Sequence, residues 1–180
     1  MKIAIVDLDD VLCISTKVWV DFANEKTSNK CDNLIELKKT LDYAQYKKLK
    51  YEYRTSGIKA TLPIMQGVKE LIGALKRKNY TIIIMTARPI YDIPEVFRDT
   101  LSWLKKNNIQ HDLLFGGGKN KHLKILKYFP MANFMIEDNH ETANAVAQQG
   151  YKVFLLDNQY NQHPLHKGVK RVFSLKEIEV

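Results

Sequence analysis

Three carboxylates occur within four residues near the start of the chain, in Asp7-Leu-Asp9-Asp10-Val11. They end and follow a short β-branched apolar run at residues 2–7, which is typical of a strand buried on both faces of a parallel sheet. Carboxylates this close together repel one another unless a cation neutralises them, and a divalent metal is the simplest such cation. The alternative is that these acids merely begin a solvated turn.

A second group of polar residues ends another apolar run, at residues 81–86. Thr86 is its last residue, and Ala87 and Arg88 follow. A hydroxyl, backbone amides and a guanidinium at the carboxyl end of a strand can together bind phosphate oxygens. Threonine commonly ends strands, so this group gains weight only in combination with the acids.

Two further acids, Glu137 and Asp138, end and follow a third apolar run at residues 133–137. In a parallel sheet the carboxyl ends of the strands lie at one edge, where ligands bind. We therefore expect Asp138 and Thr86 to converge on the same point as the first acids.

A phosphate facing these carboxylates also needs a cation, and residues 116–130 hold four lysines and no acid. Lys119 is the preferred candidate, because it would begin a helix in which Leu123 and Leu126 follow at spacings of four and seven. This spacing would put Lys119 on the core-facing side of the helix. Lys121 is the second candidate.

The remaining elements alternate between strand and helix. Residues 151–156 and, more weakly, residues 112–115 are predicted strands, and helical spacing occurs around residues 68–75, 97–104 and 143–147. Such alternation implies crossover connections and a doubly wound α/β fold with a mostly parallel sheet.

One segment breaks this alternation. Residues 13–62 are too many for a structureless connection inside a compact domain, and their apolar residues have irregular helical spacing without a clear strand. We expect a small helical cap inserted after the first strand, with residues 1–12 and 63–180 forming the core.

Together these motifs resemble the four signatures of the haloacid dehalogenase superfamily of phosphatases. Asp7, Asp9 and Val11 match the first signature, and a strand ending in Thr86, a lysine-led helix and Asp138 match the others in order. The resemblance covers essentially the whole chain and implies a Rossmann-like core.

The resemblance implies a mechanism as well. Asp7 would attack phosphorus to form an aspartyl-phosphate, while Asp9 protonates the leaving oxygen and later activates water. Mg²⁺ would be bound by Asp7, the backbone carbonyl of Asp9 and Asp138. Thr86 and the lysine would bind the remaining phosphate oxygens. Glu137 stands where many relatives have a second aspartate, which leaves its role open.

Within the superfamily, Thr-Ala-Arg-Pro at residues 86–89, the short cap and Leu-Leu-Asp-Asn-Gln-Tyr-Asn at residues 155–161 look like 5'(3')-deoxyribonucleotidase-like proteins of bacteria and phages. This resemblance implies a nucleoside monophosphate as substrate, with Trp19 or Phe22 of the cap stacking on the base. Cap aromatics also commonly form a core, so both interpretations stay open.

The net charge of +8 and the pI near 9.3 favour anionic partners without distinguishing small phosphorylated molecules from nucleic acid. The chain also looks like the phosphatase domain of bacteriophage polynucleotide kinases, so processing of nucleic acid ends is an alternative. A glycosyltransferase that uses Asp-x-Asp is disfavoured, because only six residues precede the motif. A noncatalytic phosphate or nucleic-acid binding module is disfavoured because both aspartates are present.

The first ten residues turn acidic after a very short apolar run, which predicts neither a signal peptide nor a membrane span. Cys13 and Cys31 form no CxxC pattern, so reduced thiols and a cytoplasmic location are expected. The oligomeric state cannot be predicted from these features.

Overall fold

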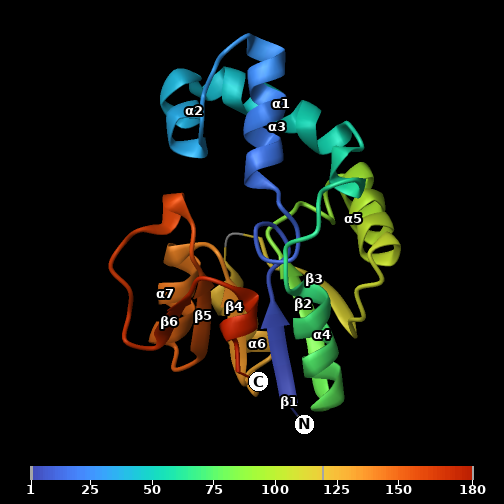
Figure 1. The fold of residues 1–180 in the computed structure, drawn as a ribbon, viewed down its shortest axis with the longest axis vertical. Coiled ribbons are helices and arrows are strands. Elements are labelled where there is room, and N and C mark those ends of the chain that lie inside the picture. Colours follow the sequence, from blue (N-terminus) through green and yellow to red (C-terminus); the bar gives the residue numbers. More distant parts are fainter. Residues whose placement is uncertain (1, 119, 180) are drawn as a thin grey trace.

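The computed structural model describes residues 2–118 and 120–179. Its centre is a six-stranded sheet in the order β3-β2-β1-β4-β5-β6 (Figure 1). The strands are β1 (Lys2–Val6), β2 (Tyr80–Thr86), β3 (Leu113–Gly116), β4 (Phe134–Glu137), β5 (Lys152–Leu156) and β6 (Val169–Val172). Every neighbouring pair is parallel, so the predicted α/β fold with a parallel sheet is confirmed.

The order of the strands reverses at β1, which pairs with β2 on one side and with β4 on the other. Val6 is in register with Ile84 and with Ile136, so these three strands end at nearly the same level. In doubly wound sheets the crevice for a ligand opens at such a reversal. Asp7 and Asp138 follow the two strands that border it.

Helices cover both faces of the sheet. They are α4 (Val68–Arg77), α5 (Pro94–Lys106), α6 (Lys121–Tyr128) and α7 (His140–Gln148). Side chains of β1 alternate between the two faces: Ala4 and Val6 lie in the core with α4 and α5, whereas Ile3 and Ile5 pack with α6 and α7. This alternation explains why the strand is apolar throughout.

Two details differ from the sequence prediction. The helix expected around residues 97–104 is present as α5, but it buries Val96, Thr100, Trp103 and Leu104, whereas Phe97 and Leu101 are each 40% exposed. The hydrophobic pattern indicates only part of this face, because one of its buried members is the polar Thr100. Strand β6 was not predicted at all, since a short edge strand with lysine and arginine carries little apolar signal.

A helical cap is inserted after the first strand, as predicted, and lies above the carboxyl ends of the strands (Figure 1). It contains α1 (Thr16–Thr27), α2 (Leu34–Thr40), α3 (Tyr43–Thr55) and the 3₁₀ turn η1 (Ile58–Ala60). Two further 3₁₀ turns, η2 (Gln159–Asn161) and η3 (Leu175–Glu177), lie in the core. The cap has its own apolar cluster, centred on Trp19, Leu37 and Tyr53. Its predicted boundaries at residues 13 and 62 stay a prediction.

The two connections between cap and core run side by side. The N–H of Ile14 donates to the carbonyl of Pro63, and the N–H of Met65 donates to the carbonyl of Leu12, both at 2.9 Å. The returning connection is also attached to α5, because the indole N–H of Trp103 donates to the carbonyl of Leu62 at 2.7 Å. In the described part of the chain, every helix is too short or too polar to span a lipid bilayer.

Replacing Trp103 with phenylalanine tests this attachment. Because the Leu62 carbonyl would stay buried without a donor, we expect the free energy of unfolding to fall by about 1–3 kcal/mol. Urea denaturation followed by circular dichroism measures it. The control is Leu101→Ala on the exposed face of the same helix, with an expected change within about 0.5 kcal/mol. Equal losses in both variants would contradict a special role for the Trp103 hydrogen bond.

Candidate active site

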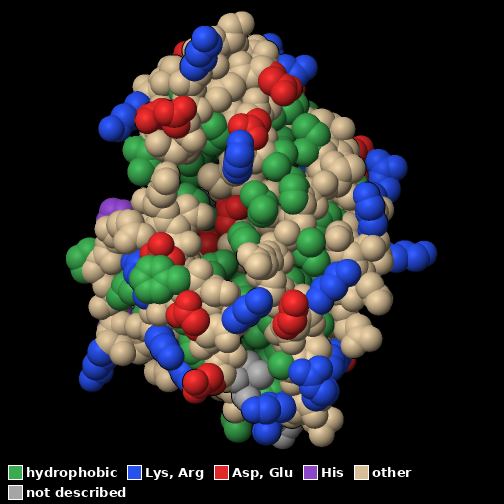
Figure 2. Space-filling model, in the orientation of Figure 1, with side chains coloured by type: hydrophobic (Ala, Val, Ile, Leu, Met, Phe, Trp, Pro, Cys, Tyr) green, Lys and Arg blue, Asp and Glu red, His purple; other side chains and the backbone are tan. Residues whose placement is uncertain are grey.

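A cavity of about 530 Å³ lies between the cap and the carboxyl ends of the strands. The core contributes its floor, which consists mainly of charged side chains: Asp7, Asp9, Asp10, Arg88, Lys121, Glu137 and Asp138. The space-filling view shows a hollow between the cap and the core, with acidic side chains inside it (Figure 2). The predicted convergence of residues from different strands on one edge is therefore present.

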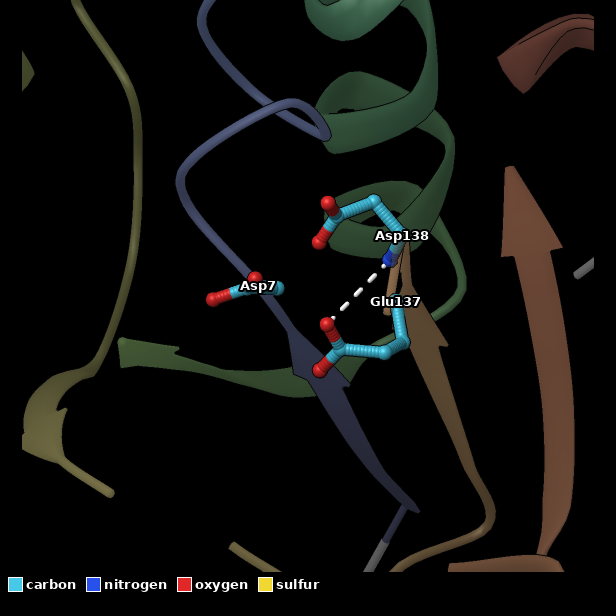
Figure 3. A group of neighbouring side chains, drawn as sticks. All are labelled: Asp7, Glu137 and Asp138. Atoms are coloured by element: carbon cyan, nitrogen blue, oxygen red, sulfur yellow. Dashed lines mark hydrogen bonds between the residues drawn. The ribbon is translucent and has the colours of Figure 1, made fainter. Parts of the chain in front are cut away.

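Three of the acids form a compact cluster. Carboxylate oxygens of Asp7, Glu137 and Asp138 lie within 4.8 Å of one another at the ends of β1 and β4 (Figure 3). The Glu137 carboxylate also accepts hydrogen bonds from the backbone N–H groups of Asp138 and Asn139, at 3.2 and 3.1 Å. Glu137 thereby fixes the loop that carries Asp138.

Lys121 is the lysine that the structure places in this cluster. Its ammonium nitrogen lies 2.7 Å from Asp7 and 2.9 Å from Glu137, and all three side chains are buried. The prediction that Leu123 and Leu126 lie on the core-facing side of this helix is wrong, because they are 54% and 37% exposed. Helix α6 begins at Lys121. Lys119 itself lies outside the described residues.

One lysine does not balance the three clustered carboxylates of Asp7, Glu137 and Asp138. Burial and the neighbouring charge of Glu137 raise the pKa of Asp7 to about 7, although Lys121 opposes the shift. Burial, Glu137 and Asp7 also raise the pKa of Asp138 well above its usual range. The excess of negative charge and the all-oxygen donors suit a hard divalent cation such as Mg²⁺. The residues present therefore fit the metal that the sequence resemblance implies.

Asp9 is held away from this cluster by basic residues. The Arg88 guanidinium donates to both of its carboxylate oxygens, with the shortest contact at 2.6 Å, and the Lys59 ammonium lies 3.7 Å away. Burial alone would raise the pKa of Asp9, but Arg88 and then Lys59 outweigh it and hold the pKa well below its usual range. A contribution of Asp9 to a metal site would have to come from its backbone carbonyl.

Arg88 occupies a different position from the one expected. Besides binding Asp9, it donates to the hydroxyl of Thr100 at 3.0 Å, and its side chain is only 1% exposed. A buried guanidinium without a carboxylate would cost several kcal/mol, so it pairs with the acid within reach. In this arrangement Arg88 positions Asp9 and is not free to bind a phosphate.

Thr86 and Ala87, the other two residues expected to bind phosphate, lie at different depths. Ala87 lines the cavity. Thr86 is fully buried beneath it, and its hydroxyl accepts a hydrogen bond from the backbone N–H of Arg88 at 3.1 Å. Thr86 therefore shapes the loop after β2.

Asp10 shapes the entrance to the cap instead of joining the acidic cluster. One of its oxygens accepts hydrogen bonds from the backbone N–H groups of Ser15 and Thr16, both at 2.9 Å. Its backbone has a positive φ of 58°, which turns the chain sharply after β1. These contacts satisfy the third acid of the motif without a metal.

Sequence reasoning noticed the motif at residues 155–161 but did not assign roles to Tyr160 and Asn161. The hydroxyl of Tyr160 lies 2.5 Å from the Asp138 carboxylate and 3.1 Å from that of Asp10. The side chain of Asn161 donates to the backbone carbonyl of Asp138 at 2.7 Å and is itself bound by Arg171. These residues follow β5, the strand beside β4, and they position Asp138.

The cap aromatics proposed to stack on a base do not line the cavity. Trp19 is 1% exposed and packs against Tyr53 at 5.3 Å between ring centroids, and Phe22 packs against the same ring at 5.5 Å. Tyr46 is the cap aromatic that reaches the cavity. Trp19 and Phe22 thus form the core of the cap.

Comparison with known proteins gives the family. A sequence profile described as 5' nucleotidase, deoxy (pyrimidine), cytosolic type C protein matches residues 1–180. The chain belongs to this family. A curated nucleotidase from Clostridium acetobutylicum is 30% identical over 129 residues, which are 72% of this chain. The match spans 62% of that relative, so the chain covers about three fifths of its length.

Solved structures similar to this member of the cytosolic type C family share its fold. CbbY from Rhodobacter sphaeroides, solved with xylulose-(1,5)bisphosphate, has a TM-score of 0.64 at 13% identity and covers 97% of this chain and 94% of its own. A haloacid dehalogenase-like hydrolase from Streptococcus pneumoniae has a TM-score of 0.62, also at 13% identity, with coverages of 88% and 87%. The haloacid dehalogenase-type fold implied by the sequence resemblance is therefore confirmed.

The balance of charge around Lys121 can be tested by its replacement with methionine. Asp7 and Glu137 would then lose their buried partner, and we expect the free energy of unfolding to fall by about 3–5 kcal/mol. Urea denaturation measures it. Lys127→Met, on the exposed side of α6, is the matched control. Adding Glu137→Gln to Lys121→Met should recover part of the loss, because one unpaired carboxylate is removed. Wild-type stability of Lys121→Met would contradict this account.

Proposed function

We propose that this chain is a Mg²⁺-dependent phosphomonoester hydrolase that acts through an aspartyl-phosphate on Asp7, and that its substrates are nucleoside monophosphates. The observation that carries the proposal is the buried Asp7 carboxylate, which lies beside Lys121 and within a cluster of magnesium-type donors. This cluster forms the floor of a cavity large enough for a nucleotide.

The chain's own residues would perform both chemical steps. An oxygen of Asp7 attacks phosphorus and displaces the leaving oxygen, which takes a proton from Asp9. Water then attacks the phosphorus of the aspartyl-phosphate, gives its proton to Asp9 and releases inorganic phosphate. When bound, Mg²⁺ would be held by Asp7, Asp138 and the backbone carbonyl of Asp9, and would offset the charge of the phosphoryl group. Lys121 would bind a phosphate oxygen.

Asp9 must carry a proton although its pKa is low in this structure. A phosphate dianion that enters beside Asp9 raises its pKa again, because a like charge disfavours the ionised carboxylate. The same dianion competes with Asp9 for the Lys59 ammonium, which lies 3.7 Å from the carboxylate. Entry of the substrate would therefore prepare Asp9 for proton transfer.

Family membership supports the nucleotide as substrate. The family description names a pyrimidine deoxynucleotidase, and the curated relative is a nucleotidase. The description also names a cytosolic protein, which supports a cytoplasmic location.

Phosphate release from a panel of substrates tests the activity. The panel contains nucleoside 3'- and 5'-monophosphates, sugar phosphates and 3'-phosphorylated oligonucleotides, each with Mg²⁺ and with EDTA. We expect release from mononucleotides with Mg²⁺, loss of release in EDTA and recovery when excess Mg²⁺ is added. Release only from oligonucleotides would replace this proposal by end processing. No release from any compound would refute it.

Replacement of the two aspartates tests the mechanism. Asp7→Asn should abolish turnover without changing the fold, because the amide has a similar size but is a poor nucleophile. Asp9→Asn should lower kcat by roughly 10²- to 10⁴-fold through loss of proton transfer. Steady-state kinetics measures both, with circular dichroism to check folding. Asp92→Asn, an exposed aspartate of the core, is the control. Turnover at the wild-type rate by folded Asp7→Asn would rule out the covalent step.

A further inference from the structure

The roof of the cavity carries a basic cluster that the proposed mechanism does not use. Tyr46, Lys50 and Arg54 follow one another at intervals of four along α3, which puts them on one face of the helix, and all three line the cavity. Lys59 of η1 lines it as well. Among the described lining residues, the cap contributes these three cations and no acid. The roof is therefore positive, and it faces an acidic floor.

The cations of this cluster have few partners. The Lys59 ammonium is 3.7 Å from Asp9, whose carboxylate is already bound by Arg88. Within residues 2–118 and 120–179, no carboxylate oxygen lies within 4.0 Å of the basic groups of Lys50 and Arg54. These two side chains are thus available to an anion in the cavity.

Aromatic rings hold the lysines in place. The Lys50 ammonium lies 4.3 Å from the centroid of the Trp19 ring and 5.2 Å from that of Tyr53. The Lys59 ammonium lies 5.1 Å from the same Tyr53 ring. Cation–π contacts fix the direction of an ammonium without neutralising its charge. Both ammonium groups therefore lie near the Tyr53 ring, and these ring contacts supply neither lysine with a counter-ion.

This arrangement costs free energy while no anion is bound. Burial and the neighbouring charge of Lys59 lower the pKa of Lys50 to about 7. Clusters of like charge with shifted pKa values occur preferentially where a ligand of opposite charge binds. The phosphoryl group to be transferred would already be bound by Lys121, which belongs to the floor of the cavity and not to the cap.

We propose that Lys50 and Arg54 form a second anion site, which binds a second phosphate group of the substrate while Asp7 attacks the first. The proposal rests on the proposed function and extends its substrate class from nucleoside monophosphates to small compounds with two separate phosphates, such as nucleoside 3',5'-bisphosphates. The cavity volume of about 530 Å³ is of the size that encloses one such molecule. A phosphodiester at the end of an oligonucleotide offers similar chemistry and is distinguished by the test.

Ligand binding to full-length Asp7→Asn protein tests the site without any turnover. Titration calorimetry with Mg²⁺ compares thymidine 3',5'-bisphosphate with thymidine 3'- and 5'-monophosphate, which each lack one phosphate. We expect the bisphosphate to bind at least about tenfold more tightly than either monophosphate. Adding Lys50→Gln and Arg54→Gln should abolish this preference. The control pair, Lys47→Gln and Lys48→Gln on the exposed side of α3, should keep it.

A charge-conserving variant excludes a merely structural effect. Lys50→Arg with Arg54→Lys should retain most of the preference for the bisphosphate, and added salt should weaken that preference. An equal loss for monophosphate and bisphosphate in the Gln pair, or no loss for either, would overturn the proposal. So would an effect of the Gln pair on a 3'-phosphorylated oligothymidylate but not on the bisphosphate. If this preference is found but no substrate releases phosphate, the second anion site stands and the proposed hydrolase activity fails.

Discussion

The structure depends on one buried ammonium group. Lys121 lies between Asp7 and Glu137, and each of these side chains is at most 7% exposed. Buried charges are tolerated only while each keeps its partner, because an unpaired charge in the interior costs several kcal/mol. The first turn of α6 and the ends of β1 and β4 must therefore keep one relative placement. This constraint acts where the strand order reverses, which is the point at which a doubly wound sheet opens a crevice for a ligand.

A second group of contacts attaches the cap to the same point. Arg88 of the core and Lys59 of the cap both lie against Asp9, the residue after which the chain turns into the cap. Asp10 accepts hydrogen bonds from the start of α1, and Trp103 binds the returning connection. Because these contacts adjoin the acidic cluster, a movement of the cap would change the electrostatic surroundings of Asp9. The position of the cap and the protonation of the candidate acid are therefore linked.

The cavity separates charge between its two walls. The carboxylate cluster of Asp7, Glu137 and Asp138 belongs to the core. The cap contributes the cations Lys50 and Arg54, which line the cavity. Solved structures at 13% identity share the fold, but shared fold leaves the lining of the site free to differ. The substrate that this protein selects should therefore follow from the cap residues that line the cavity, of which Lys50 and Arg54 are the most distinctive.

The sequence by itself determined the parallel sheet and the convergence of Asp7 and Asp138, because apolar strands are recognised locally and parallel strands end at one edge. Only the tertiary structure decided which lysine enters the acidic cluster, that Arg88 binds an aspartate of the first motif, and that Tyr160 reaches Asp138. These side chains are polar and are buried through partners distant in the sequence, so hydrophobic periodicity contains no signal for them. Burial of Lys121 is stable only beside carboxylates that other strands supply, and the fold alone brings them there.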